Sequence, residues 1–290
     1  MIYTLKNEEL TVRIDALGAE LRSCVSNKDG CEYMWQGDPT YWEGTSPWLF
    51  PICSNVYQKQ YTYRGKTYPM GLHGFASHSV FEATEVSETA LTLRLAPNEQ
   101  TRACYPFEFV FSVAYRLNRN RLECTATIEN KGEDVMYATM GAHPGFNVPL
   151  GGEGAYEDWC LEFSEPCTPR SVVFTEDMYD SGERAPLELA GNRRLVLSHD
   201  LFLIDGIFMA DVPGSVTLRS DKAAHSVTVT YGSMPYVGVW SSDNGGPYVC
   251  VEPWYGMASR EGVRDIEEKE DLFKMPAGDV KILRMDIDFN

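Results

Sequence analysis

The sequence has no long apolar run, either within the chain or at its N-terminus. A membrane-spanning helix needs about 20 consecutive apolar residues, and no stretch of the chain approaches that length. The acidic residues Glu8 and Glu9 stand where the central part of a signal peptide would be uncharged. We therefore expect a cytoplasmic protein that does not have a membrane surface as a partner.

Cysteines are sparse too: the 290 residues include eight, and no two form a Cys-x-x-Cys pair. Zinc sites and disulfide scaffolds need closer and more regular spacing. Cys124 and Cys250 fall in apolar, strand-like runs, where a free thiol behaves as a small buried hydrophobic group. We expect reduced thiols without a structural metal.

Positive charge is also scarce: the chain has 25 lysines and arginines but 42 aspartates and glutamates, which gives a net charge of −17. A field of this sign repels nucleic acids and anionic bilayers, so neither is an expected partner. A neutral small molecule is indifferent to it. The hydrophobic fraction of 43% and the aromatic fraction of 12% are ample for a large core.

Alternation of apolar and polar residues dominates the chain, for example over residues 10–14, 91–95 and 227–231. This period of two is typical of half-buried strands. Residues 109–115 and 122–128 predict a hairpin joined by 116–120. Helical candidates are few and short, 175–178 and 263–272 being the best, and no fixed-period repeat occurs. We predict one antiparallel all-β domain over residues 1–290.

Three short blocks, residues 71–76, 141–147 and 251–256, set His73, His143 and Glu252 among glycine, proline and aromatic residues. Two histidines and a glutamate can supply a proton donor and a proton acceptor. His143 and Glu252 each precede a proline, which favours extended geometry, so we expect both at strand ends beside a cleft. Burial would raise the pKa of Glu252 and make it a better base. The alternatives are a structural histidine at position 73 and a salt-bridged structural acid at position 252.

Other side chains are weaker candidates. Asp200 and Asp205 bracket an apolar run, and one of them could bind hydroxyl groups in a cleft. Aromatic rings stack on sugars but lie more often in cores; the candidates are Phe75, Trp240, Trp254 and Tyr255. Two histidines and a carboxylate could also hold a metal, but the chain lacks the short His-x-His or His-x-Glu pairing that often marks such sites. We favour a site without metal.

Taken in order along the chain, several motifs resemble the aldose 1-epimerase (galactose mutarotase-like) family, above all its bacterial LacX-like branch. The motifs are residues 17–21, 46–52, 71–76, 141–147, 235–241 and 250–256. The resemblance implies a large antiparallel β-supersandwich with few short helices, a sugar cleft on one concave face, and catalysis without a cofactor or a metal.

By this resemblance, Glu252 matches the catalytic base, His143 the catalytic acid and His73 a substrate-binding histidine. Asp200 is the first candidate for an aspartate that binds sugar hydroxyls, with Asp205 as the alternative. Phe75 and Trp254 are expected to contact the sugar. Asn55 stands where many relatives have an arginine, and an amide can bind a hydroxyl but cannot pair with a phosphate dianion.

The expected activity is interconversion of the α and β anomers of a neutral aldohexose, with Glu252 ionised and His143 protonated. One alternative is a non-catalytic carbohydrate-binding or sensing domain on the same fold. Another is a hexose-6-phosphate 1-epimerase, which would need a basic cluster at the cleft. Lys59, Arg64 and Lys66 instead belong to a predicted exposed hairpin. The partner is a small sugar, and the protein is expected to be a monomer or a homodimer.

Overall fold

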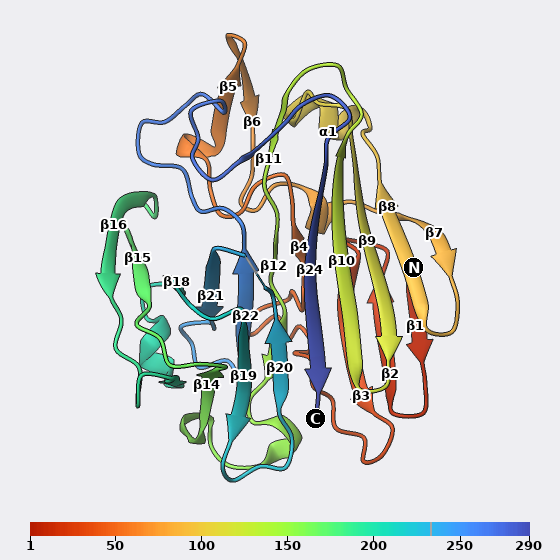
Figure 1. The fold of residues 1–290 in the computed structure, drawn as a ribbon, viewed down its shortest axis with the longest axis vertical. Coiled ribbons are helices and arrows are strands. Elements are labelled where there is room, and N and C mark those ends of the chain that lie inside the picture. The colour runs from red at the N-terminus through yellow and green to blue at the C-terminus, as the bar shows by residue number, and fades with distance from the viewer. Residues whose placement is uncertain (233) are drawn as a thin grey trace.

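The structure is a computed structural model that describes residues 1–232 and 234–290. Two large sheets form its body (Figure 1), and every pairing between named strands in these residues is antiparallel. The prediction of a large antiparallel β-supersandwich is confirmed.

The first sheet has nine strands, and the longest of them stand at its centre (Figure 1). Their order across the sheet is β17 (Arg194–Val196), β14 (Trp159–Phe163), β19 (Ser215–Ser220), β20 (Val227–Thr230), β24 (Val280–Phe289), β10 (Arg121–Asn130), β9 (Phe109–Asn118), β8 (Ala90–Leu95) and β7 (Glu82–Val86). The predicted hairpin is β9–β10, with Asn118 opposite Arg121 at its turn.

The second sheet has eight strands and contains two of the three sequence blocks. Its order is β16 (Asp180–Pro186), β15 (Arg170–Phe174), β18 (Ile207–Ala210), β21 (Tyr236–Trp240), β22 (Tyr248–Trp254), β12 (Gly141–Ala142) and β4 (Trp48–Leu49), with β13 (Gly145–Asn147) also paired to β22.

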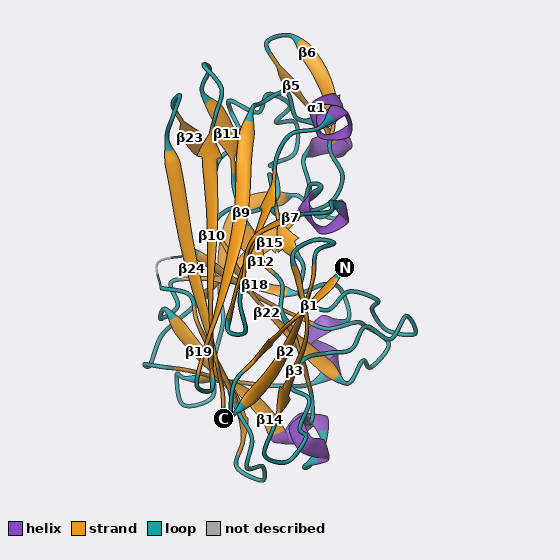
Figure 2. Cartoon of the chain, turned by 90° about the vertical axis from the view of Figure 1, so that its right-hand side faces the viewer, coloured by secondary structure: helices purple, strands orange, loops and turns teal. Residues whose placement is uncertain are grey.

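Smaller elements complete the chain. In Figure 2 the sheet of β1–β3 forms a layer apart from the long strands β9, β10 and β24. The small sheets comprise β1 (Ile2–Lys6), β2 (Leu10–Asp15) and β3 (Glu20–Ser26), then β5 (Gln60–Tyr63) with β6 (Lys66–Pro69), and β11 (Met136–Ala138) with β23 (Phe273–Met275). The helices are α1 (Glu99–Cys104) and the 3-10 turns η1 (Tyr57–Lys59), η2 (Ala76–His78), η3 (Leu150–Gly152), η4 (Tyr156–Asp158) and η5 (His199–Phe202). None of these helices is long and apolar enough to cross a membrane.

Alternating side chains of the sheets build the core. In β10, Leu122, Cys124, Ala126 and Ile128 are all buried, while the residues between them are less so. One hydrophobic cluster extends from Leu5 to Phe289 along the chain and takes in residues of both large sheets and of β1–β3. The apolar side chains at alternate strand positions therefore form one shared interior, which holds the layers together.

Two expectations about local structure are wrong. The first is the pair of helices: residues 175–178 and 263–272 form turns and an isolated bridge instead, because neither segment has an apolar stripe to bury. The second is the exposure of the β5–β6 hairpin: the hairpin forms as predicted, but its tyrosines (Tyr61, Tyr63 and Tyr68) are buried.

Candidate active site

A cavity of about 410 Å³ brings the three sequence blocks together, mainly over the eight-stranded sheet. Its polar lining consists of Ser54, Asn55, His73, His143, Asp205 and Glu252. Its apolar lining consists of Trp42, Pro47, Leu72, Phe174, Met178, Phe208, Trp240 and Trp254. A mostly apolar hollow with a few convergent polar groups is typical of a small-molecule site.

Glu252 lies within β22 rather than at its end, so the expected strand end at this position is wrong. Pro253 continues the strand and faces Val237 of β21. On the opposite side, Val251 donates its N–H to Pro144 and Tyr255 donates to Met140. Pro253 lies between these two bonds and has no N–H to donate, so it interrupts the ladder between β22 and the chain that runs from β12 to β13.

His143 follows the two-residue strand β12, so the prediction of a strand end is confirmed here. Its backbone N–H bonds to Pro47 O at 3.1 Å, and that of Gly145 bonds to Thr45 O at 2.8 Å. The short strand thus stops at the histidine and resumes as β13. This break allows the imidazole to line the cavity.

The catalytic candidates meet in the cavity wall. His143 Nε2 lies 3.2 Å from Glu252 Oε2, with side-chain exposures of 11% and 1%. Burial, aided by the charge of Asp205, raises the pKa of Glu252 well above its usual range. Burial also lowers the pKa of His143 to about 4. Both shifts disfavour the ion pair relative to the neutral pair, in which Glu252 carries the proton and His143 carries none.

No hydrogen bond within the described part of the chain satisfies either oxygen of Glu252 or Nδ1 of His143. Buried polar groups without partners are costly. Here they surround a cavity, so a bound molecule with hydroxyl groups would supply the missing donors and acceptors.

His73 sits on a strained turn against the same cavity. Both His73 and Gly74 have positive φ, at 60° and 76°, and a Cβ at Gly74 would overlap the carbonyl oxygen of Phe50. Ser54 donates its backbone N–H to His73 Nδ1 at 3.0 Å. Burial and the neighbouring His143 lower the pKa of His73 to about 3, so the ring is neutral with its proton on Nε2. His73 can therefore donate a hydrogen bond to a ligand oxygen.

Indole rings enclose the two imidazoles. The ring of Trp42 lies 5.0 Å from that of His143 at an interplanar angle of 32°. Trp240 meets His143 edge-on at 5.6 Å, and Trp254 meets His73 edge-on at 5.3 Å. These rings offer flat apolar surfaces to a ligand.

Of the two candidate aspartates, the structure places Asp205 at the cavity and Asp200 away from it. Asp200 belongs to η5, where its N–H bonds to the cap residue Ser198, and its side chain is exposed. Asp205 follows η5 and lines the cavity, and burial raises its pKa. Asp205 therefore replaces Asp200 as the candidate for hydroxyl binding.

Phe75 also lies outside the cavity lining. Its ring packs edge-on against Phe50 at 5.7 Å and joins the main hydrophobic cluster. Tyr255, another candidate, packs on Phe273 at 4.0 Å. Asn55 and Trp254 do line the cavity, as expected. The roles of all these residues stay predictions.

Several lining residues escaped the sequence analysis. Trp42 and Pro47 come from an irregular segment with no periodicity, and Phe174 and Phe208 alternate like ordinary core residues. No sequence signal marks Met178, which is the last residue of the wrongly predicted helix 175–178. Of these, Trp42 had the best available signal, because it is a tryptophan in a polar loop.

One group of described side chains could in principle hold a metal: His143, Cys250 and Glu252, whose ligand atoms lie within 4.8 Å of one another. Burial raises the pKa of the Cys250 thiol well above its usual range, as it does that of Glu252. A metal would have to displace protons from both buried groups. The donor set therefore fits a resident metal poorly.

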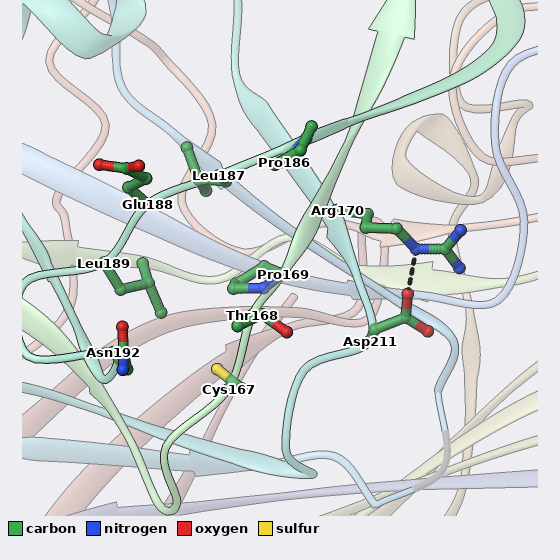
Figure 3. Close-up of a pocket in the computed structure, with 10 residues that line it drawn as sticks. All are labelled: Cys167, Thr168, Pro169, Arg170, Pro186, Leu187, Glu188, Leu189, Asn192 and Asp211. Atoms are coloured by element: carbon green, nitrogen blue, oxygen red, sulfur yellow. Dashed lines mark hydrogen bonds and ion pairs between the residues drawn. The ribbon is translucent and has the colours of Figure 1, made fainter.

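A larger surface hollow, of about 960 Å³, lies beside β15 and β16 (Figure 3). Its charged side chains are Glu188 and the ion pair Arg170–Asp211, all outside the hydrophobic core. Among the described residues, its lining includes no histidine and no buried carboxylate. The hollow therefore lacks the pair of buried acid and base groups that the first cavity has.

The buried histidines predict a specific response to acid. At about pH 5.5, the unfolded chain carries a proton on His73, whose ordinary pKa is 6.5, whereas the folded chain, in which that pKa is about 3, does not. His73 therefore destabilises the fold as pH falls from about 6.5, by about 1.4 kcal/mol per pH unit.

We expect His73→Asn to reduce by that amount the pH slope of the unfolding free energy, measured by urea denaturation between about pH 4.5 and 6.5. Asparagine tolerates positive φ and can still accept from Ser54. His78→Asn, at an exposed histidine, should keep the wild-type slope. Equal slopes in the wild type and His73→Asn would contradict the neutral state of His73.

Comparison with known proteins agrees with this geometry. The family model described as Aldose 1-epimerase matches residues 1–261. The chromosomal LacX protein of Lactococcus lactis subsp. lactis is 37% identical over 286 residues, which are 95% of each chain. A galactose mutarotase related enzyme from Lactobacillus acidophilus has a TM-score of 0.94 at 33% identity and covers 100% of this chain and 97% of its own. A galactose mutarotase-like protein from Lactobacillus casei has a TM-score of 0.92 at 30% identity, with full coverage of both chains. The chain therefore belongs to the aldose 1-epimerase family.

Proposed function

We propose that this protein is an aldose 1-epimerase that interconverts the α and β anomers of a neutral aldohexose. The observation that carries the proposal is the buried His143–Glu252 pair, 3.2 Å apart and facing a cavity of about 410 Å³. A binding module would need stacking surfaces and hydroxyl partners. It would not need an acid and a base in contact.

In the proposed reaction, Glu252 as carboxylate removes the proton from the C1 hydroxyl while His143 as imidazolium protonates the ring oxygen. The bond between C1 and the ring oxygen breaks, and C1 becomes an aldehyde carbon. Rotation about the C1–C2 bond presents the other face of the carbonyl, and the reverse transfers close the ring. Each positioned proton-transfer group contributes about 10²- to 10⁴-fold.

The contact between the two groups suits this mechanism. The pair with the proton on Glu252 and the pair with the proton on His143 differ only in which side of the 3.2 Å contact holds the proton. A sugar whose C1 hydroxyl and ring oxygen approach the two groups from the cavity stabilises the charged arrangement, because it supplies hydrogen bonds that the Glu252 oxygens lack. The raised pKa of Glu252 also makes it a stronger base than an exposed carboxylate.

Binding of the sugar ring falls to the remaining polar groups. His73 Nε2–H donates to an oxygen near C1, while Asp205 and Asn55 pair with hydroxyls further along the ring. Trp42, Trp240 and Trp254 pack against its C–H faces. These assignments follow from the lining of the cavity and from the neutral state of His73.

A neutral sugar suits the charges around the cavity better than a phosphorylated one. Among the described lining residues none is a lysine or an arginine, and Asp205 is acidic. Arg64 is paired with Asp134 at 2.6 Å, and Lys66 lies over the ring of Tyr68. Neither Arg64 nor Lys66 lines the cavity, so a phosphate dianion would find no cationic partner there.

Exchange NMR on freshly dissolved α-glucose and α-galactose, with their 6-phosphates in parallel, tests the proposal. We expect saturable acceleration with at least one free sugar and a kcat/KM at least about tenfold lower for its 6-phosphate, the cost of one unpaired charge. Binding without acceleration would instead favour a sugar sensor. A preference for the phosphates would favour a hexose-6-phosphate 1-epimerase.

A further inference from the structure

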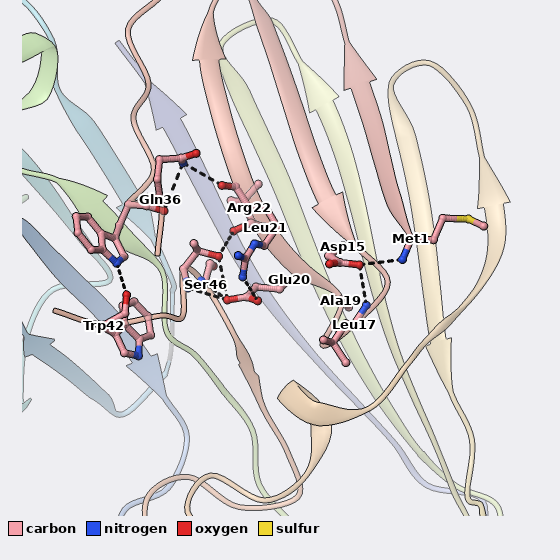
Figure 4. A network of polar contacts seen from close by, with 12 residues as sticks. Met1, Asp15, Leu17, Ala19, Glu20, Leu21, Arg22, Gln36, Trp42 and Ser46 are labelled. Carbon is pink, nitrogen blue, oxygen red and sulfur yellow. Dashed lines mark hydrogen bonds and ion pairs between the residues drawn. The ribbon is translucent and has the colours of Figure 1, made fainter. Parts of the chain in front are cut away.

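The partly buried carboxyl group of Glu20, at the start of β3, holds the segment that carries Trp42 to the wall of the cavity. Glu20 Oε1 accepts the backbone N–H groups of Thr45 at 2.8 Å and Ser46 at 2.9 Å, and it lies 2.9 Å from the Thr45 hydroxyl. Its second oxygen accepts from Arg22 at 2.8 Å. The side chain is only 12% exposed, and Figure 4 shows how these groups converge on it. Hydrogen bonds from several N–H donors to one carboxyl group are among the strong ones.

The segment that Glu20 holds, residues 42–47, is tied in turn to the chain around His143. Thr45 O accepts the N–H of Gly145 and Pro47 O accepts that of His143. The contacts of Glu20 with Thr45 and Ser46 therefore fix the two carbonyl groups that flank the catalytic candidate. Glu20 itself does not line the cavity.

The same segment places an indole ring on the imidazole. Trp42 O accepts from Trp35 Nε1 at 2.8 Å (Figure 4), and the ring of Trp42 lies 5.0 Å from that of His143. His143 has little else to hold its ring, because its Nδ1 makes no hydrogen bond to the described residues. Its orientation therefore depends on the indole rings and on Glu252.

We propose that Glu20 is a positioning residue: its carboxylate fixes residues 42–47 so that Trp42 and the backbone of His143 hold the imidazole against Glu252. The expected effect of Glu20 on the reaction rate rests on the proposed epimerase function. Its expected effect on the orientation of the His143 ring does not depend on activity. A displacement of about 1 Å at a reacting group can cost about 10²-fold in rate.

Two measurements on Glu20→Ala test the proposal. We expect kcat per folded protein to fall by at least about tenfold with a smaller change in KM. We also expect the histidine NMR signals of His143 to shift, because the ring-current field of Trp42 changes when the indole moves. Glu20→Gln, which keeps an oxygen acceptor for Thr45 and Ser46, should restore most of both properties.

Glu32→Ala is the matched control. Glu32 also binds backbone N–H groups, those of Cys24 at 2.8 Å and Met34 at 3.0 Å, but within the described chain it makes no hydrogen bond to residues 42–47. It should lose stability without changing kcat or the His143 signals. A second check combines Glu20→Ala with Trp42→Ala: since both act through one element, the double variant should lose little more rate than Trp42→Ala alone.

The outcomes separate this proposal from the proposed function. An inactive wild type would refute the epimerase function, while the His143 signals would still decide the role of Glu20. Unchanged His143 signals in Glu20→Ala, or equal changes in Glu32→Ala, would overturn it. Should the alanine variant not fold, Glu20→Met keeps the side-chain length, removes both acceptors and is judged by the same measurements.

Discussion

Glu252→Gln is expected to lower the rate of anomer interconversion by about 10²- to 10⁴-fold while largely sparing sugar binding. The amide has the size of the carboxyl group and can hydrogen-bond a hydroxyl, but it cannot accept the C1 proton. The variant should also fold well, because position 252 is 1% exposed and burial already disfavours the charge there. Polarimetry measures the rate, and quenching of tryptophan fluorescence by the sugar measures binding.

Asp205→Asn is the control for this variant. It removes a second carboxylate of the same cavity, and because Asp205 is assigned to hydroxyl binding, its loss should raise KM more than it lowers kcat. A Glu252→Gln variant with near-wild-type rates would show that the base lies elsewhere. If Asp205→Asn lowered kcat more than Glu252→Gln does, the result would indicate that Asp205 is the base.

His143→Gln is expected to cause a comparable loss, about 10²- to 10⁴-fold in kcat, because no remaining group can protonate the ring oxygen at that position. His73→Asn provides a close comparison, since the two imidazole rings are only 5.9 Å apart. His73 is assigned to binding, so its replacement should act mainly on KM. Initial rates across a range of sugar concentrations separate the two effects.

The double variant of His143 and Glu252 adds a further check. Groups that act as a unit lose most of their effect when the first is removed. We therefore expect His143→Gln with Glu252→Gln to be scarcely slower than either single variant. Losses that multiply would mean that the two groups act in independent steps, which would contradict the proposed mechanism.

The fold could be predicted because most strands are half-buried, so that alternation along residues such as Leu122, Cys124 and Ala126 directly reports which face is inside. Helix α1 was missed because it has only six residues, and its signal is the local capping box of Asn98 and Thr101 rather than a periodic stripe. The strand order could not be predicted. It depends on pairings such as β20 with β24, whose partners are far apart along the chain.

Three residues of the site could be predicted because a local sequence pattern marks them. His73, His143 and Glu252 stand beside glycine or proline, and such residues mark places where the chain departs from regular pairing. Asp200 and Asp205 look alike in the sequence, and only the 3-10 turn capped by Ser198 decides which of them lines the cavity. The pKa shifts could be anticipated for Glu252, but the extent of His143 burial depends on Trp42 and Trp240, which come from distant segments.

The contact between His143 and Glu252 has a consequence for the proposed catalytic cycle. Ring opening would move one proton from the C1 hydroxyl to Glu252 and another from His143 to the ring oxygen, and ring closure would move both back. Each proposed turnover therefore returns the pair to its starting protonation state, and no exchange with buffer is needed to reset it.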